Sequence, residues 1–163
     1  MEFKENLSGI NSFSFAHWLF GRSLGLVTLI AFLSYWVQAD ALIGPGGLSP
    51  WQTDLENIDA FIESENTEFT KLSLRPTLLW FSPLANHNLI FFIGSVSALL
   101  LTLGFLPLLA AFFAWLCYLS LSVVGDPFLS FQWDTLLLET LFLSLPFLPL
   151  ISIHRLTRPV QYS

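Results

Sequence analysis

The sequence has few charged residues and only one cysteine. Only 11% of its 163 residues are Asp, Glu, Lys or Arg, about half of what a soluble domain uses to cover its surface. A single cysteine, Cys117, cannot form a disulfide framework within the chain. Basic residues are scarce too, six against twelve acids, and the resulting net charge of −6 excludes a basic nucleic-acid binder.

Hydrophobic and aromatic residues take the place of the missing charge. They make up 54% and 16% of the chain, and the mean hydropathy is +0.67. Such a composition excludes intrinsic disorder and favours the lipid bilayer as the surrounding solvent. We therefore expect an all-α, polytopic membrane helix bundle that forms one domain over residues 1–163.

Four long stretches almost free of charge predict about four transmembrane helices. A span of about 20 residues crosses the hydrocarbon layer at about 1.5 Å per residue. The helices are expected at about residues 18–38, 83–103, 106–124 and 134–153.

Glycine and proline mark the expected helix ends. Residues 83–124 contain no charge but are long enough for two crossings, so we place a tight turn at Gly104–Pro107. Ser82 is the expected N-cap of the second helix, with Pro83 in its first turn. Pro146 and Pro149 should kink the inner half of the fourth helix.

A polar segment, residues 40–81, separates the first two apolar stretches and should form one structured loop outside the membrane. Thr53 and Glu56 have the spacing of a capping box, and a short amphipathic helix is expected after them. Its apolar face would carry Leu55, Ile58, Phe61 and Ile62. The segment's acids are Asp40, Asp54, Glu56, Asp59, Glu63, Glu65 and Glu68.

Basic residues in the short flanks favour a cytoplasmic N-terminus. This orientation places Lys4, Arg22, Arg155 and Arg158 inside and leaves Lys71 and Arg75 outside. The alternative is that the first stretch is a cleaved signal peptide, because Ala39-Asp40-Ala41 has the form of a cleavage site. The long, acid-containing flank before it argues against that alternative.

Glu139 is the most informative single residue, since an acid within a membrane-spanning helix costs about 2.5 kcal/mol or more without a partner. Counted from Asp134, it would lie about 7 Å below the outer boundary. It is therefore either functional or an acid tolerated near the interface. Arg22 should lie too far away for a direct salt bridge and should instead cap neighbouring carbonyls or reach inner head groups.

Polar residues from several segments should meet at the outer face. This possible polar cluster contains Asn86, His87, Asn88 and Asp126 near Gln132, Asp134 and Glu139. It predicts either a site with His87 as a base or ligand, or ordinary helix-capping residues. The three histidines lack the spacing of metal ligands, and we expect no metal, no cofactor and no catalytic motif.

One motif resembles the lipase maturation factor family. It is the string Phe128, Leu129, Ser130, Phe131, Gln132, Trp133, Asp134, followed by Leu136-Leu137-Leu138-Glu139. Further similar segments are Arg22–Leu26 with Ile30–Ser34, Leu42–Gly44 with Gly46–Pro50, and Pro76–Trp80. Members normally continue with more transmembrane helices and a further domain, so the resemblance implies that this chain is a fragment, a shortened paralogue or part of a split system.

The resemblance implies a multipass membrane protein that helps secreted lipase-like clients to fold and mature. Animal members sit in the endoplasmic reticulum; for this chain we favour a bacterial inner membrane. The motif around Trp133 and the outward loop would bind a partner: a client or further membrane subunits, besides membrane lipids. The family is also similar to the membrane domain of vitamin K-dependent carboxylase, so a membrane enzyme or lipid-handling protein using His87, Asp134 and Glu139 is the alternative. A remnant without independent activity is the third reading.

Overall fold

A computed structural model describes residues 2–65, 70–81 and 86–150, and every regular element in these ranges is helical. The prediction of an all-α fold is therefore confirmed over this part of the chain. The α-helices, with two short 3₁₀ turns, are α1 (Glu2–Leu42), α2 (Trp51–Glu65), α3 (Lys71–Leu74), η1 (Leu78–Trp80), α4 (His87–Leu103), α5 (Pro107–Val124), α6 (Asp126–Leu129), α7 (Gln132–Ser144) and η3 (Leu145–Phe147).

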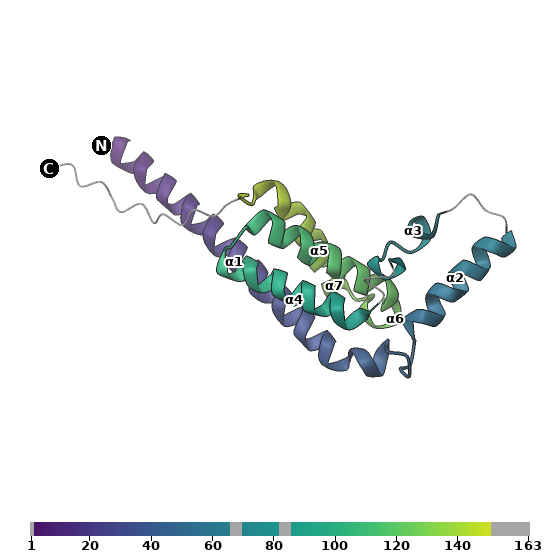
Figure 1. Cartoon of the computed structure of the whole chain (residues 1–163). Helices are drawn as coiled ribbons and strands as arrows, with labels where there is room; N and C mark the ends of the chain where they lie inside the picture. Colours follow the sequence, from purple (N-terminus) through teal and green to yellow (C-terminus); the bar gives the residue numbers. More distant parts are fainter. Residues whose placement is uncertain (1, 66–69, 82–85, 151–163) are drawn as a thin grey trace.

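Helices α1, α4, α5 and α7 form the bundle (Figure 1). Helix α1 packs most extensively on α4, and α4 on α5, while α7 lies against α5. Both α5 and residues 15–42 of α1 are long and apolar enough to cross a membrane. Helix α4 is apolar as well, with 17 residues, whereas α7 has only 13.

The helix ends differ from the expected ones at three places. Helix α4 begins at His87 with Asn86 as N-cap, and the expected starting residues Ser82 and Pro83 lie outside the described residues. Helix α2 begins at Trp51, so Thr53 lies inside it and caps nothing. Helix α7 ends at Ser144, where Pro146 in the following 3₁₀ turn prevents its continuation.

The turn between α4 and α5 has the residues that the sequence predicts. Gly104 adopts the left-handed conformation at φ 81°, which lets its N–H bond the carbonyls of Leu100 and Leu101 at the end of α4. Pro107 then occupies the first turn of α5, where its missing N–H costs nothing. The two helices consequently run antiparallel as a hairpin.

Glycine allows α1 and α4 to pack closely. A Cβ on Gly25 would lie 2.5 Å from the backbone nitrogen of Thr102, and one on Gly94 would lie 2.3 Å from the ring of Phe32. Phe32 is fully buried and packs edge-on against Tyr118 of α5, so three helices meet around its ring. The core of the bundle lies at this junction.

Helix α7 starts below the end of α5 rather than level with it. The short helix α6 turns the chain back, and Asp134 in the first turn of α7 meets Tyr118, about 9 Å below Val124 at about 1.5 Å per residue. Farther along, Phe142 packs on Trp115, and the Leu108 N–H donates to the Pro149 carbonyl. Most of α7 therefore lies beside the middle and the N-terminal half of α5.

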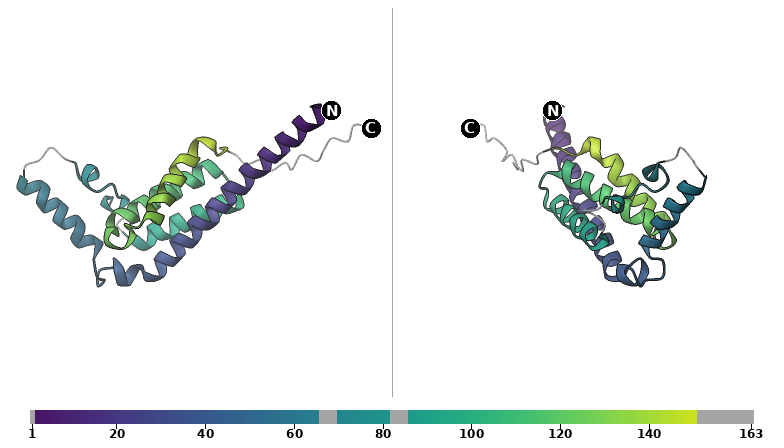
Figure 2. Two further views of the ribbon diagram at one scale, coloured as in Figure 1. Left: turned by 180° about the vertical axis from the view of Figure 1, so that it is seen from behind. Right: turned by 45° about the vertical axis from the view of Figure 1, so that its right-hand side comes forward.

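The polar segment projects from the bundle at the end opposite the N-terminus, with α2 reaching outward (Figures 1 and 2). Trp51 and Leu55 at its base are buried, whereas Phe61 near its tip is 48% exposed. Ile58 and Ile62 are half-buried, so the expected apolar face exists but is covered only towards the base.

Candidate functional site

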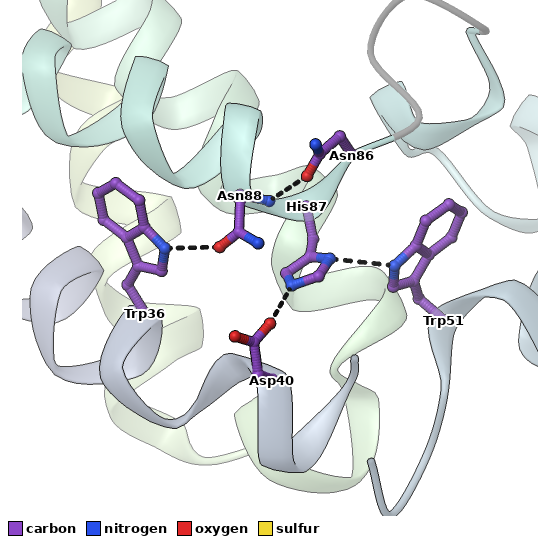
Figure 3. A network of polar contacts seen from close by, with 6 residues as sticks. All are labelled: Trp36, Asp40, Trp51, Asn86, His87 and Asn88. Carbon is purple, nitrogen blue, oxygen red and sulfur yellow. Dashed lines mark hydrogen bonds and ion pairs between the residues drawn. The ribbon is translucent and has the colours of Figure 1, made fainter. Parts of the chain in front are cut away.

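A histidine connects the three elements that meet at the end of the bundle from which α2 projects. His87 in the first turn of α4 is buried and lies between Asp40 of α1 and Trp51 of α2 (Figure 3). Its Nε2 is 2.9 Å from Asp40 Oδ1, and its Nδ1 is 3.3 Å from Trp51 Nε1. The indole N–H of Trp51 can only donate, so Nδ1 of His87 accepts this hydrogen bond. Nε2 of His87 then carries the ring's hydrogen and donates a hydrogen bond to Asp40 Oδ1.

Asparagines complete this polar network. Asn86 caps α4 by accepting from the Asn88 N–H, and Asn88 Oδ1 accepts from Trp36 Nε1 at 2.8 Å. Asn86, His87 and Asn88 thus lie together at the start of α4, with partners on α1 and α2. Since Asp40 is 82% exposed while His87 is buried, the network fastens α2 to the bundle rather than forming an enclosed catalytic site.

Replacing His87 by leucine should loosen the outward segment. The buried Trp51 N–H would lose its acceptor, at a cost of about 1–3 kcal/mol. We expect severalfold faster cleavage at Glu56 and Glu63 by a glutamate-specific protease. Asn86→Asp, which preserves the cap, should leave the rate unchanged. Equal rates for His87→Leu and the wild type would contradict the fastening role.

Arg75 is the second connection between the outward segment and the bundle. Its guanidinium donates to Asp54 of α2 at 3.2 Å and to the carbonyl of Val123 in α5 at 3.2 Å, and it lies 3.8 Å from Asp126. Asp126 thus pairs with Arg75 rather than with the group around His87. Thr77 adds a hydrogen bond to the Ser120 carbonyl, so residues 75–80 are tied to the end of α5.

Arg75→Gln should lower the thermal midpoint of the protein in detergent. Half-buried charge-assisted hydrogen bonds contribute about 1.5–3 kcal/mol, and the substitution removes them. Lys71→Gln is the matched control, because the Lys71–Asp59 pair is exposed and such pairs contribute about 0–1 kcal/mol. Equal midpoint shifts for the two variants would show that Arg75 does not join the two parts.

The family motif divides between the core and the outer surface of α7. Leu129 is buried and Phe128 half-buried, while Tyr118 donates to Asp134 Oδ1 at 2.6 Å. Gly125 lets the Tyr35 hydroxyl approach closely, since a Cβ there would lie 2.4 Å from that oxygen. The exposed members of the motif are Ser130, Phe131, Gln132, Trp133, Leu136 and Glu139.

Glu139 lies near the middle of the bundle and not close to the end from which α2 projects. It sits between Asp134, which meets Tyr118, and Phe142, which meets Trp115, and both contacts fall in the middle of α5. Its side chain is exposed on the surface of α7. The expected depth of about 7 Å assumed that the helix begins level with the ends of its neighbours, whereas the first turn of α7 meets Tyr118, six residues before the end of α5.

Arg22 has partners of its own. It donates to the Thr102 carbonyl at 2.7 Å and lies over the ring of Trp18, so the expected capping of a neighbouring helix is confirmed. No ion pair joins it to Glu139 within the described ranges. Gly104 leaves room for the guanidinium, since a Cβ there would lie 2.8 Å from Arg22 Nη2.

The residues of the enzymatic alternative have separate surroundings. His87 contacts Asp40 and Trp51, Asp134 contacts Tyr118, and Glu139 faces outward. Among the described residues, no group of three His, Cys, Asp or Glu side chains could hold a metal ion. The pairing of Asp40 with His87 was missed in the sequence, although both lie at the outer ends of consecutive apolar stretches.

Comparison with known proteins agrees with the motif. Residues 15–163 match the family described as "Lipase maturation factor transmembrane domain". The chain is 32% identical to mouse lipase maturation factor 1 over 84% of its own length and 25% of that protein. It is 34% identical to human lipase maturation factor 2 over 81% of its length and 19% of that protein.

The chain thus spans about a quarter or less of the curated relatives it matches. No solved structure matches it. The family match covers most of the chain, including residues 15–42 of α1, the apolar helices α4 and α5 and the motif around Trp133. The chain therefore belongs to the lipase maturation factor family and carries its transmembrane domain.

Proposed function

We propose that the chain is the membrane-embedded part of a maturation factor for secreted lipase-like clients. The observation that carries this proposal is the family match over residues 15–163, together with relatives named as lipase maturation factors. The structure agrees with a role in which one end of the bundle holds a projecting segment outside the membrane. That segment is where a secreted client would meet the protein.

Four crossings with a cytoplasmic N-terminus fit the arrangement of the helices. Helices α4, α5 and α7 run in alternating directions beside α1, so successive connections lie at opposite ends of the bundle (Figure 2). The segment with α2 and α3 then lies outside, with its acids and only Lys71 and Arg75 as bases. This agrees with the preference for basic residues on the cytoplasmic side.

A client would contact α2 rather than Trp133. Trp133 is 77% exposed, but it shares a groove with Val27 and Phe20 in the apolar part of α1, at membrane depth. Helix α2, in contrast, reaches beyond the bundle with an acidic surface and the exposed Phe61 near its tip. The polar contacts of His87 and Arg75 hold this helix in place for binding.

Deleting the chain's gene in its own host tests the maturation role. We expect the secreted lipases to lose activity per unit of lipase protein severalfold, with recovery when the full chain is expressed again. Unchanged specific activity of every secreted lipase would contradict the proposal. A fall in secreted lipase protein at constant specific activity would indicate an export role and would contradict it as well.

Cysteine labelling tests the orientation. The native thiol, on the buried Cys117, is removed by Cys117→Ser. The thiol introduced by Glu63→Cys is then the group that reacts with the label. A membrane-impermeant maleimide should label residue 63 from the outside of intact cells. Labelling only after the inner side of the membrane is opened to the reagent would contradict the assigned orientation.

A further inference from the structure

Glu139 is an exposed carboxyl group at the middle of a membrane bundle. No hydrogen bond or ion pair reaches its side chain from the part of the chain that the structure describes. Acids at this depth face protein, water or a charged partner, because lipid chains offer neither hydrogen-bond donors nor positive charge. The position of Glu139 therefore calls for a partner outside the described chain.

Two more polar side chains share this face of α7. Gln132, Thr135 and Glu139 are spaced three and four residues apart, so they form one stripe along the helix. All three are exposed and line one shallow hollow together with Ser130 and Leu136. Their side chains, like that of Glu139, have no hydrogen-bond partner among the described residues.

An apolar groove adjoins the stripe. Leu136 belongs both to the hollow at Glu139 and to a groove of about 390 Å³ between α1 and α7. That groove shares Phe20 and Thr140 with a second one, of about 460 Å³, which continues to Phe147. The two helices make few contacts with each other here, so the groove runs open along most of α7.

Small residues lie in the walls of this groove. They are Ala16, Ser23, Thr140 and Ser144. Small side chains let the backbone of another helix approach closely, which is how membrane helices associate. A groove of this length beside a polar stripe fits a helix better than a lipid tail, because a helix can supply a polar side chain at the level of Glu139.

The charge of Glu139 determines which helix fits. A second copy of this chain cannot provide a base, since residues 23–70 and 76–154 contain no Lys or Arg and Arg22 already binds Thr102 and Trp18. Two copies facing each other would instead bring two acids together. The complementary partner is a transmembrane helix from outside residues 1–163 that carries a positive charge.

We propose that the stripe of Gln132, Thr135 and Glu139, with the α1–α7 groove, binds one transmembrane helix from outside residues 1–163 that presents Lys or Arg to Glu139. This inference rests on the proposed membrane embedding of the four helices, and it adds a membrane partner to the proposed client. The basic side chain would pair with the Glu139 carboxylate, and the amide of Gln132 would bond polar groups of the same helix.

Photocrosslinking in membranes of the native host tests this proposal. The full chain carries p-benzoylphenylalanine at Thr135, and the control carries it at Phe92, an exposed position on α4. We expect the Thr135 probe to yield an adduct whose partner peptide, identified by mass spectrometry, is an apolar membrane-spanning segment with Lys or Arg. The Phe92 probe should not yield that adduct.

Glu139 variants complete the test. Glu139→Gln should reduce the adduct severalfold and Glu139→Leu should abolish it, at unchanged membrane levels. Three kinds of adduct would overturn the inference: one only with lipid, one only with a second copy, or one with a segment that lacks a base. The absence of any adduct, or the same adduct in Glu139→Leu, would overturn it as well. The two proposals can also fail separately. If the adduct forms in membranes that contain the chain but deletion of the gene leaves secreted lipase activity normal, only the maturation role is contradicted.

Discussion

Replacing Gly25 by alanine is expected to force α1 away from α4 and to lower the stability of the bundle strongly. The new methyl group would lie 2.5 Å from the Thr102 nitrogen and 2.8 Å from its hydroxyl. A backbone atom cannot move aside unless the helices separate, so the cost should be at least that of overpacking a core, about 1–3 kcal/mol. Gly94→Ala should act similarly through the buried ring of Phe32.

The thermal midpoint in detergent, measured by size-exclusion chromatography of heated samples, checks this prediction. Gly46→Ala is the matched control, because nothing lies within 4 Å of a Cβ at that position. Adding Phe32→Leu should partly restore Gly94→Ala, where a side chain is the obstacle, but not Gly25→Ala. Midpoints for Gly25→Ala equal to those of Gly46→Ala would show that α1 and α4 do not pack as closely as described.

Replacing Glu139 by leucine is expected to stabilise the isolated chain while removing its function. On the proposed embedding of α7, an exposed acid at this depth costs about 2.5 kcal/mol or more, and leucine inserts favourably. The thermal midpoint and the level in the membrane should therefore rise or stay the same. A structural residue would behave in the opposite way, since its removal lowers both.

Two further variants separate charge from shape at this position. Glu139→Gln keeps the size and one acceptor oxygen, so it should keep part of the function. Leu99→Ala alters an exposed apolar residue on α4, away from the polar stripe, and should change nothing. A fall in membrane level for Glu139→Leu would contradict the prediction, because it would mean that the acid stabilises the fold of the chain itself.

Local chemistry made much of the bundle predictable from the sequence. Charge-free stretches longer than a core helix indicated membrane-spanning segments. Gly104 and Pro107 predicted the turn between α4 and α5, since one allows the left-handed conformation and the other starts a helix. The acids of residues 40–81 likewise predicted a polar segment outside the bundle.

The features that the sequence could not indicate depend on contacts between segments far apart in the chain. Counting from Asp134 assumed that its helix begins at the membrane boundary, whereas the bond to Tyr118 places that residue well inside the bundle. The pairings of Asp40 with His87 and of Arg75 with Asp126 also join segments far apart in the chain. Sequence spacing gives depth only when both ends of a helix are known.

The most direct test that the maturation role depends on Glu139 compares Glu139→Leu with the wild type in the deletion host. The measured quantity is the activity of secreted lipase per unit of lipase protein, at equal membrane levels of the two chains. The account predicts restoration by the wild type and a specific activity as low as that of the deletion strain for Glu139→Leu. Full restoration by Glu139→Leu would contradict the role of Glu139, whereas failure of the wild type to restore activity would contradict the maturation role.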